Sequence, residues 1–389
     1  MSVALVNGRV LRDDTLVEGQ CVLLEGARIA AIVDADDPRG RAAQRYDLGG
    51  GLLLPGFIDS QVNGGGGVLF NDSPSVEAIR TIGAAHRRFG TTGFLPTLIS
   101  ADLDVVARAI AAVRSAIQAG VPGVLGLHIE GPYLNAARKG VHDPAKLREL
   151  DASAVGLLTS LREGRTLVTL APEMTTPDII EKLVAAGVVV SAGHTNATYA
   201  EIEPALRHGL TGFTHLFNAM SQLTGREPGA VGAALSDQAS WCGIIVDGVH
   251  TDPVVLRIAL KCKPHERFML VTDAMPSVGT TNGSFDLQGR RITVKGYICV
   301  DEDGTLAGSN IDMASSVRNA MSLLGLPLPA AVRMASQWPA QFLGLAQDLG
   351  RIAPGYRANL VLADEHLNVL ETWIDGRAST APGSPATGR

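Results

Sequence analysis

From Leu52 onward, the sequence alternates between short apolar runs and longer amphipathic segments, and this alternation constrains the fold most strongly. Short apolar runs predict buried strands, and amphipathic segments that begin at capping residues predict helices. The strand candidates are Leu52–Asp59, Gly93–Ile99, Gly123–Glu130, Leu167–Pro172, Val188–Gly193, Gly212–Leu216, Cys242–Asp247 and Phe268–Asp273. The helix candidates between them include Ser75–Phe89, Leu103–Ala119, Pro177–Ala186, Tyr199–His208 and Asp252–Lys261. Eight buried strands interleaved with helices predict an α/β protein built on a parallel (β/α)8 TIM barrel.

The main alternative to a barrel is an open, doubly wound parallel sheet. Dinucleotide-binding sheets of that kind carry G-x-G-x-x-G after an early strand. No early strand of this sequence is followed by such a motif, and the tetraglycine Gly64–Gly67 suits a tight or flexible loop. The barrel is therefore the predicted fold, with its active site at the C-terminal ends of the strands.

The two ends of the chain differ from the barrel segment in their sequence pattern. Residues 1–52 contain short strand-like stretches between Gly, Asp and Asn, with no helical period of useful length, and similar texture returns from Gly350. We expect a small β-sandwich domain formed jointly by residues 1–52 and 350–377, with the barrel at 53–349. Residues 378–389, rich in small and turn-forming residues, are expected to be a disordered tail.

The segment between the eighth predicted strand and residue 350 is expected to complete the barrel. Residues 286–307 are predicted to form a hairpin around Lys295 and Gly296. Two helices are predicted after it, at about 310–324 and 329–343.

Charge and cysteine usage exclude several classes of function. The 33 Lys and Arg residues against 39 Asp and Glu give a net charge of −6 without long runs of either sign, so no nucleic-acid surface is expected. The four cysteines form no C-x-x-C pair, which favours a reducing, cytoplasmic compartment. The N-terminus lacks a signal-peptide pattern, and no window carries the roughly 18 apolar residues that a membrane span needs.

Four acidic or imidazole side chains stand where a predicted strand gives way to small, polar or turn-forming residues. Glu130 ends the third strand, and His194 and His215 follow the fifth and sixth. These three could supply ligands to a zinc-like ion and leave a position open for water. Asp273, at the end of the eighth strand, could take that water's proton and pass it to a leaving amine. A core histidine or a helix N-cap would explain any one of them, but four at strand ends favour a site.

Two further side chains have both a functional and a simpler interpretation. His250, after the seventh strand, could polarise a scissile carbonyl opposite the ion, or it could be a surface-loop histidine. Arg226, in a loop rich in Gly and Pro, suits a bidentate grip on a phosphate, and a solvated arginine is an equally good interpretation from chemistry alone.

The ordered series of motifs resembles the amidohydrolase superfamily and, within it, the single-metal deacetylase family that acts on N-acetylglucosamine 6-phosphate. The resemblance covers nearly the whole chain. Its segments are Pro55–Asp59, Gln61–Gly64, His128–Tyr133, Lys139–His142, Gly193–Ala197, His215–Met220, Thr224–Gly229, Val271–Ala274 and Leu306–Ser309.

This resemblance implies a role for each candidate residue. Glu130, His194 and His215 would hold one divalent ion per subunit, Zn²⁺, while Asp273 would be the acid and base and His250 would assist at the acetyl carbonyl. The residues implied to contact the sugar phosphate are Val141, His142, Asn218, Ala219, Arg226, His250, Leu306, Ala307, Gly308 and Ser309. The family also implies a homodimer in which Arg226 completes the neighbouring active site.

One departure from the wider superfamily bears on the metal content. Many members carry H-x-H after the first strand and bind two metals, whereas Gln61 and Asn63 fill that spacing here. Neutral amides are poor zinc ligands beside imidazole, so the sequence predicts a single metal.

The sequence as a whole predicts a metal-dependent deacetylase that hydrolyses the acetamide of N-acetylglucosamine 6-phosphate to glucosamine 6-phosphate and acetate. The alternatives are the same chemistry on N-acetylgalactosamine 6-phosphate or on an N-acyl amino acid. A non-catalytic binding protein on the amidohydrolase fold is a further alternative. Such proteins usually lose the metal ligands or the carboxylate of the eighth strand, and all four residues are present here.

Overall fold

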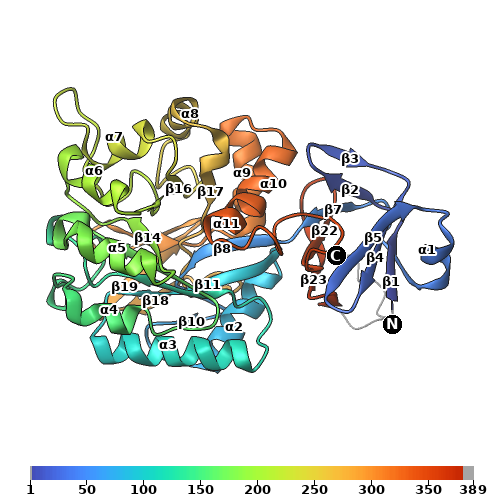
Figure 1. Cartoon of the computed structure of the whole chain (residues 1–389), viewed down its shortest axis with the longest axis horizontal. Helices are drawn as coiled ribbons and strands as arrows, with labels where there is room; N and C mark the ends of the chain where they lie inside the picture. Colours follow the sequence, from blue (N-terminus) through green and yellow to red (C-terminus); the bar gives the residue numbers. More distant parts are fainter. Residues whose placement is uncertain (1, 380–389) are drawn as a thin grey trace. The chain divides into compact units, whose positions relative to one another are not determined.

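The computed structural model describes residues 2–379, which divide into two compact units (Figure 1). One unit holds residues 59–85 and 94–312. The other holds residues 2–58, 86–93 and 313–379.

The larger unit is built around a sheet that has eight strands within the described residues. In spatial order these are β8 (Phe57–Val62), β11 (Thr91–Ile99), β12 (Gly126–Glu130), β13 (Arg165–Leu170), β14 (Val189–Ala192), β15 (Gly212–Phe213), β16 (Trp241–Ile244) and β17 (Phe268–Leu270). From β11 to β17, each strand pairs in parallel with the next. Every predicted strand overlaps one of these eight, so the predicted barrel is confirmed.

The first and last strands of this sheet meet through a buried carboxylate. Asp59 of β8 accepts a hydrogen bond of 2.5 Å from the Thr272 hydroxyl and one of 3.3 Å from the Thr272 amide. Further along the two strands, Val62 and Ala274 form a parallel bridge, and the Asn63 amide donates to the Ala274 carbonyl at 2.9 Å. These contacts join the sheet edges into a nearly closed barrel.

Helices follow the strands of the barrel, as the sequence predicts. In the larger unit they are α2 (Val76–Arg87), α3 (Leu103–Gln118), α4 (Ala152–Leu158), α5 (Pro177–Ala185), α6 (Tyr199–Arg207), α7 (Gly229–Ser236) and α8 (Pro253–Cys262). α3 packs against β12 and α5 against β14 (Figure 1). The sequence analysis missed α7 because its residues are small and almost all buried, so it has no polar face to create a helical period.

The residues after β17 form a four-stranded antiparallel sheet, which extends the predicted hairpin by a strand on each side. The strands are β18 (Ser284–Leu287), β19 (Arg290–Lys295), β20 (Ile298–Val300) and β21 (Leu306–Ser309). A separate pair, β9 (Gly64–Gly65) and β10 (Val68–Leu69), follows β8. Leu69, Leu287, Ile292 and Cys299 belong to one buried cluster, so the two sheets share a core.

The smaller unit contains two β-sheets that share an apolar core. One sheet has the order β5 (Arg28–Asp34), β4 (Gln20–Glu25), β1 (Ser2–Val6) and β6 (Gln44–Asp47). The other has the order β24 (Arg377–Ala378), β23 (Val369–Ile374), β22 (Leu360–Ala363), β7 (Leu52–Pro55), β2 (Arg9–Arg12) and β3 (Thr15–Val17). Leu5 and Leu24 of the first sheet pack with Leu53, Leu360 and Trp373 of the second. Strands from both ends of the chain therefore build this sandwich, as predicted.

Two features of the first 60 residues differ from the sequence analysis. The run expected as one strand at Leu52–Asp59 is two, because β7 joins the six-stranded sheet and only β8 belongs to the barrel. Between them, a Cβ at Gly56 would lie 2.0 Å from the Thr92 hydroxyl, so this close approach requires glycine. A short helix, α1 (Pro38–Ala42), capped by the Asp37 carboxylate, interrupts the segment expected to lack helices.

The helices after residue 312 also differ in part. The first is α9 (Met313–Leu324), but the segment expected as one helix at 329–343 forms α10 (Leu328–Ala335) and α11 (Gln337–Phe342). The break falls at Ser336, whose φ of −137° and ψ of −72° are not helical. Short 3₁₀ turns occur at Ala136–Arg138, Pro144–Lys146, Pro172–Met174 and His265–Arg267.

The predicted disordered tail begins inside β24, which includes Ala378, and its last ten residues lie outside the described range. Across residues 2–379, every helix is too short or too polar to span a bilayer.

The contact that closes the barrel gives a test of stability. Burial raises the pKa of Asp59 to about 7, so at pH 8 its carboxylate is mostly ionised and the Thr272 hydroxyl donates to a buried charge. We expect Thr272→Val to lower the free energy of unfolding by about 2–3 kcal/mol, measured by urea denaturation at pH 8.

Thr91→Val is the matched control. Thr91 is also buried, but its hydroxyl finds no hydrogen-bond partner anywhere in residues 2–379. This substitution should be neutral or slightly stabilising. Equal losses from the two variants would contradict a contribution of the Asp59–Thr272 hydrogen bond.

Candidate functional site

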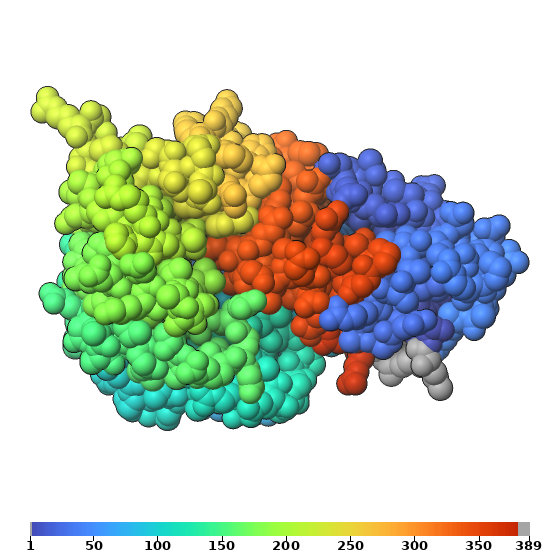
Figure 2. All heavy atoms as spheres, viewed as in Figure 1, coloured from blue at the N-terminus to red at the C-terminus, as the bar shows by residue number. Residues whose placement is uncertain are grey.

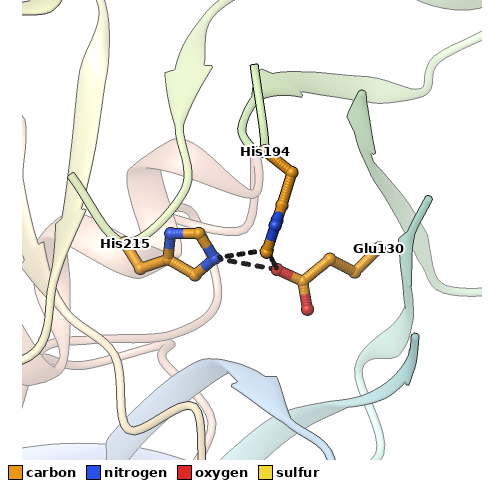
Figure 3. A group of neighbouring side chains, drawn as sticks. All are labelled: Glu130, His194 and His215. Carbon is orange, nitrogen blue, oxygen red and sulfur yellow. Dashed lines mark hydrogen bonds and ion pairs between the residues drawn. The ribbon is translucent and has the colours of Figure 1, made fainter. Parts of the chain in front are cut away.

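Glu130, His194 and His215 point toward one another from three neighbouring regions of the barrel rim (Figure 3). Glu130 is the last residue of β12, while His194 and His215 each lie two residues beyond the ends of β14 and β15. Glu130 Oε1 lies 3.2 Å from His194 Nε2 and 3.0 Å from His215 Nε2, and the two nitrogens are 3.1 Å apart. The three potential ligand atoms thus form a nearly equilateral triangle.

This triangle fits the ligand set of a zinc-like ion. With zinc–ligand distances of about 2.0–2.1 Å, the edges of a tetrahedral site are roughly 3.4 Å long. The observed edges of 3.0–3.2 Å are close to that length. Two imidazoles and one carboxylate also match the donors of hydrolytic zinc sites, which leave a fourth position open.

The backbone at these strand ends takes a left-handed conformation that residues other than glycine rarely adopt. φ is +48° at His194, +33° at His215 and +52° at Asp273. Such angles cost of order 1–3 kcal/mol each and persist only where surrounding structure enforces them. At these positions they turn the side chain out of the strand direction and into the barrel mouth.

The hydrogen bonds of His194 select which ring nitrogen faces the triangle. His194 Nδ1 donates to the Arg138 carbonyl at 2.8 Å, which leaves Nε2 as the lone-pair donor. The Arg138 carbonyl belongs to the loop that follows β12, so this loop fixes the orientation of a residue that follows β14.

The buried carboxylate of Glu130 is stabilised as an anion by its neighbours. Burial alone would raise its pKa, but hydrogen bonds and charge from His194 and His215 hold the pKa well below the ordinary value. The same pairing raises the pKa of His215, although burial opposes that rise. A carboxylate kept ionised inside the barrel is what a cation site requires.

Asp273 lies beside this group and is held by two amides. Its Oδ1 accepts from Asn63 Nδ2 at 2.6 Å and from Gln61 Nε2 at 3.0 Å, and Gln61 Nε2 also lies 3.1 Å from Glu130 Oε1. Burial, followed by the charge of Glu130, raises the pKa of Asp273 to about 6. An acid near neutrality can both take and return a proton.

Two other histidines of the pocket have opposite hydrogen-bonding patterns. The Ser100 amide donates to His142 Nδ1 at 3.3 Å, so His142 carries its proton on Nε2, and burial lowers its pKa to about 3. His250 Nδ1 instead lies 2.6 Å from Asp247 Oδ2, to which it donates. Asp247 is mostly buried and its pKa is lowered, because hydrogen bonds from His250 and Val249 outweigh the effect of burial. His142 is therefore a donor toward the pocket.

These groups line one pocket of about 500 Å³. Of the residues predicted to contact substrate, it is lined by Val141, His142, Asn218, Ala219, His250, Leu306 and Gly308. The other three do not line it. Ala307 and Ser309 are buried, with the Ser309 hydroxyl donating to the Thr272 carbonyl at 2.5 Å, and Arg226 is exposed. The loop leading to α7, yellow-green in Figure 2, projects from the surface.

Sequence reasoning missed two features of the pocket. It gave Arg138 no role, although Arg138 lines the pocket and its carbonyl orients His194. It named His142 as a neighbour of the sugar phosphate without identifying it as a donor toward the pocket, and the ring centroids of His142 and His194 are 4.4 Å apart. The short distance of both residues from Glu130 in the sequence was the available signal.

The architecture and the site together identify the class of protein. Residues 52–378 match the amidohydrolase family, whose members are metal-dependent, and the chain belongs to that family. Among its relatives, the N-acetylgalactosamine-6-phosphate deacetylase of Shewanella sp. (strain ANA-3) is 45% identical over 90% of this chain and 86% of its own length. The N-acetylglucosamine-6-phosphate deacetylase of Haemophilus influenzae is 37% identical over 97% of this chain and 99% of its own.

The fold agrees with solved structures of such enzymes. The crystal structure of N-acetylglucosamine-6-phosphate deacetylase from Pasteurella multocida matches with a TM-score of 0.94 and 36% identity, covering 98% of this chain and all of that one. The resemblance to this deacetylase family is thereby confirmed.

The two groups of His and acidic residues in the described chain allow a direct test of metal binding. Glu130, His194 and His215 form the buried group, and Asp178, Glu181 and His208 form a more exposed one. We expect His194→Ala to lose most of its zinc after dialysis against zinc and desalting, measured by atomic absorption, because two ligands hold the ion far more weakly than three.

His208→Ala is the matched control and should retain the zinc content of the wild-type protein. A loss of zinc from His208→Ala with none from His194→Ala would show that the metal binds to the exposed group of Asp178, Glu181 and His208.

Proposed function

We propose that this protein hydrolyses the acetamide of an N-acetyl hexosamine 6-phosphate, releasing acetate and the free amino sugar phosphate. The observation that carries the proposal is the triangle of Glu130, His194 and His215 with Asp273 beside it, in the lining of a pocket of about 500 Å³. The names of the relatives supply the substrate class.

The three ligand residues would hold one divalent ion per chain, with zinc as the expected metal. When bound, such an ion supplies two effects: it makes a water molecule more acidic and it polarises a carbonyl. Gln61 and Asn63 direct their amide N–H groups to the carboxylates of Glu130 and Asp273. Since these amides act as donors rather than ligands, a second tightly bound ion is not expected.

The chain's own residues would move the proton. Asp273 Oδ1 is fixed by two amides, so the carboxylate has a defined orientation in which to accept a proton from the attacking water and then deliver it to the leaving amine. His142, with its proton on Nε2, would donate a hydrogen bond to the substrate from the pocket wall. Assistance of His250 at the acetyl carbonyl stays a prediction, and its Nδ1 is held by Asp247.

Two epimers of the substrate remain candidates. N-acetylglucosamine 6-phosphate is favoured by the relatives that match nearly full length, such as the Haemophilus influenzae enzyme. N-acetylgalactosamine 6-phosphate is favoured by the 45% identity to the Shewanella enzyme. A cytoplasmic location stays a prediction from cysteine usage.

A panel of amides assayed side by side tests the proposal. Acetate release should be fastest with one of the two N-acetyl hexosamine 6-phosphates, and N-acetylglucosamine without phosphate and N-acetyl amino acids should be poor substrates. An enzyme that prefers N-acyl amino acids would contradict the proposed substrate class. A protein that binds zinc yet hydrolyses none of these amides would support the non-catalytic alternative.

Replacing Asp273 tests the proton path. Asp273→Asn keeps an oxygen to accept from Gln61 and Asn63 but cannot act as a base, so the turnover number should fall at least about a hundredfold. Metal analysis should find about one ion per chain in both the variant and the wild-type protein. Turnover close to that of the wild type would contradict the assignment, and a loss of metal would show that Asp273 contributes to the ion site instead.

We also propose a homodimer in which Arg226 reaches the partner's pocket. Arg226 is exposed and lies outside the pocket of its own chain. Its loop is well anchored: the Glu227 carboxylate accepts from the amides of Tyr199 and Gly229, and the Thr224 amide donates to the Glu227 carbonyl. A rigid, projecting cation suits recognition of a phosphate held by another subunit.

Mixing two impaired variants tests this arrangement. If each site combines Asp273 of one chain with Arg226 of the other, a mixed dimer of Asp273→Asn and Arg226→Ala has one intact site. Random pairing makes about half the dimers mixed, so about a quarter of wild-type activity should return. When subunit exchange is verified and activity does not return, Arg226 acts within its own chain or has no role.

A further inference from the structure

We infer that Arg138 is a second anion-binding residue of the pocket, which grips the phosphate of the substrate from within the same chain. This inference rests on the proposed function for the identity of the anion.

The first support is the composition of the pocket. Among residues 2–379, Arg138 is the one lysine or arginine that lines it; the remaining basic side chains of the lining are histidines. An arginine stays protonated at every physiological pH, so it gives the pocket a permanent positive charge. Arg226 does not line this pocket. Arg138 is therefore the arginine with which a single chain could bind an anionic substrate.

The second support is the way the Arg138 side chain is held. Arg138 ends the 3₁₀ turn Ala136–Arg138 and is half-buried, and its Nε donates to Asn196 Oδ1 at 3.0 Å. This is the one hydrogen bond or ion pair of its guanidinium within the described chain, so both terminal nitrogens are free to donate. A planar guanidinium anchored at Nε presents its two Nη groups as a fork, the geometry that binds a phosphate in a bidentate manner.

Two arginines on helix surfaces of this protein are paired with acids instead. Arg108 lies 2.5 Å from Asp104 and Arg207 lies 3.0 Å from Glu203, each one helical turn away. Arg138 is held by a neutral amide instead, which orients the guanidinium without neutralising its charge. An unneutralised cation at the wall of a pocket is suited to an anionic ligand.

The third support is that a single residue, Arg138, belongs both to the predicted ion site and to the pocket lining. The carbonyl of Arg138 accepts the hydrogen bond from His194 Nδ1 that orients this predicted metal ligand, and the same residue belongs to the pocket lining. One residue thus fixes the position of the anion site relative to the ion site. A substrate with a phosphate and an amide at a set separation could engage both at once, and its unphosphorylated analogue would engage only one.

Binding measurements with the zinc-loaded protein test the inference. Arg138→Ala should weaken binding of glucosamine 6-phosphate about tenfold to a hundredfold, the usual effect of losing a hydrogen bond to a charged group. Its affinity for glucosamine should hardly change. Isothermal titration calorimetry gives both dissociation constants without relying on turnover. Arg138→Lys should recover part of the loss, since it restores the charge but not the fork.

Two controls separate recognition from folding. Arg108→Ala removes an exposed arginine outside the pocket and should bind both ligands as the wild type does. Asn196→Ala releases the Arg138 side chain but keeps its charge, so it should weaken binding of the phosphorylated ligand by a few-fold only. Zinc content should be unchanged in Arg138→Ala, because the carbonyl that orients His194 remains.

The outcomes distinguish the inference from the proposed function. If the wild-type protein binds glucosamine 6-phosphate and galactosamine 6-phosphate no better than the free sugars, the proposed substrate class and the inference both fail. If it binds the phosphorylated sugars tightly and Arg138→Ala does so equally well, the inference alone is overturned. An equal loss for phosphorylated and free sugar would also overturn it, since that pattern indicates damage to the pocket rather than loss of a phosphate contact.

Discussion

The buried carboxylate of Glu130 is the constraint on which the rest of the site depends. Its residue is 2% exposed, and an isolated charge at such a depth would be strongly unfavourable. Three nitrogen atoms converge on its Oε1: His194 Nε2, His215 Nε2 and Gln61 Nε2, at 3.0–3.2 Å. They come from three different strand ends, and only a parallel barrel brings those ends to one point. Closure of the sheet through Asp59 and Thr272 is therefore a condition for charge compensation.

The amide of Gln61 connects this charge to the acid–base residue. Because one N–H₂ group serves both Glu130 and Asp273, the two carboxylates lie close together. An amide donates hydrogen bonds but adds no charge, so the repulsion between the two acids is only partly offset. The raised pKa of Asp273 follows from burial and from that remaining repulsion. A histidine in place of Gln61 would compete for metal instead of supporting the proton path.

The barrel and the cluster of four site residues could be predicted from the sequence because both depend on local patterns. Buried strands produce apolar runs, and a histidine or carboxylate directly after such a run must lie at the rim. The metal role of these residues stays a prediction, although their convergence agrees with it. Other features depend on contacts between distant segments. The tautomers of His142 and His250 are determined by Ser100 and Asp247, and the burial of Ala307 and Ser309 away from the pocket is determined by packing.

The left-handed residues at the rim have a consequence for how this protein can change. At His194, His215 and Asp273 the backbone is held in a conformation that glycine adopts freely. Replacing any of them with glycine would relieve strain, and at Asp273 it would also remove a poorly compensated buried acid. At Asp273, a selection for heat resistance alone would therefore favour an inert protein, because the change that relieves strain there also removes the residue that the chemistry needs. Durable variants of this fold should be sought in the β-sandwich and the outer helices, with the rim kept fixed.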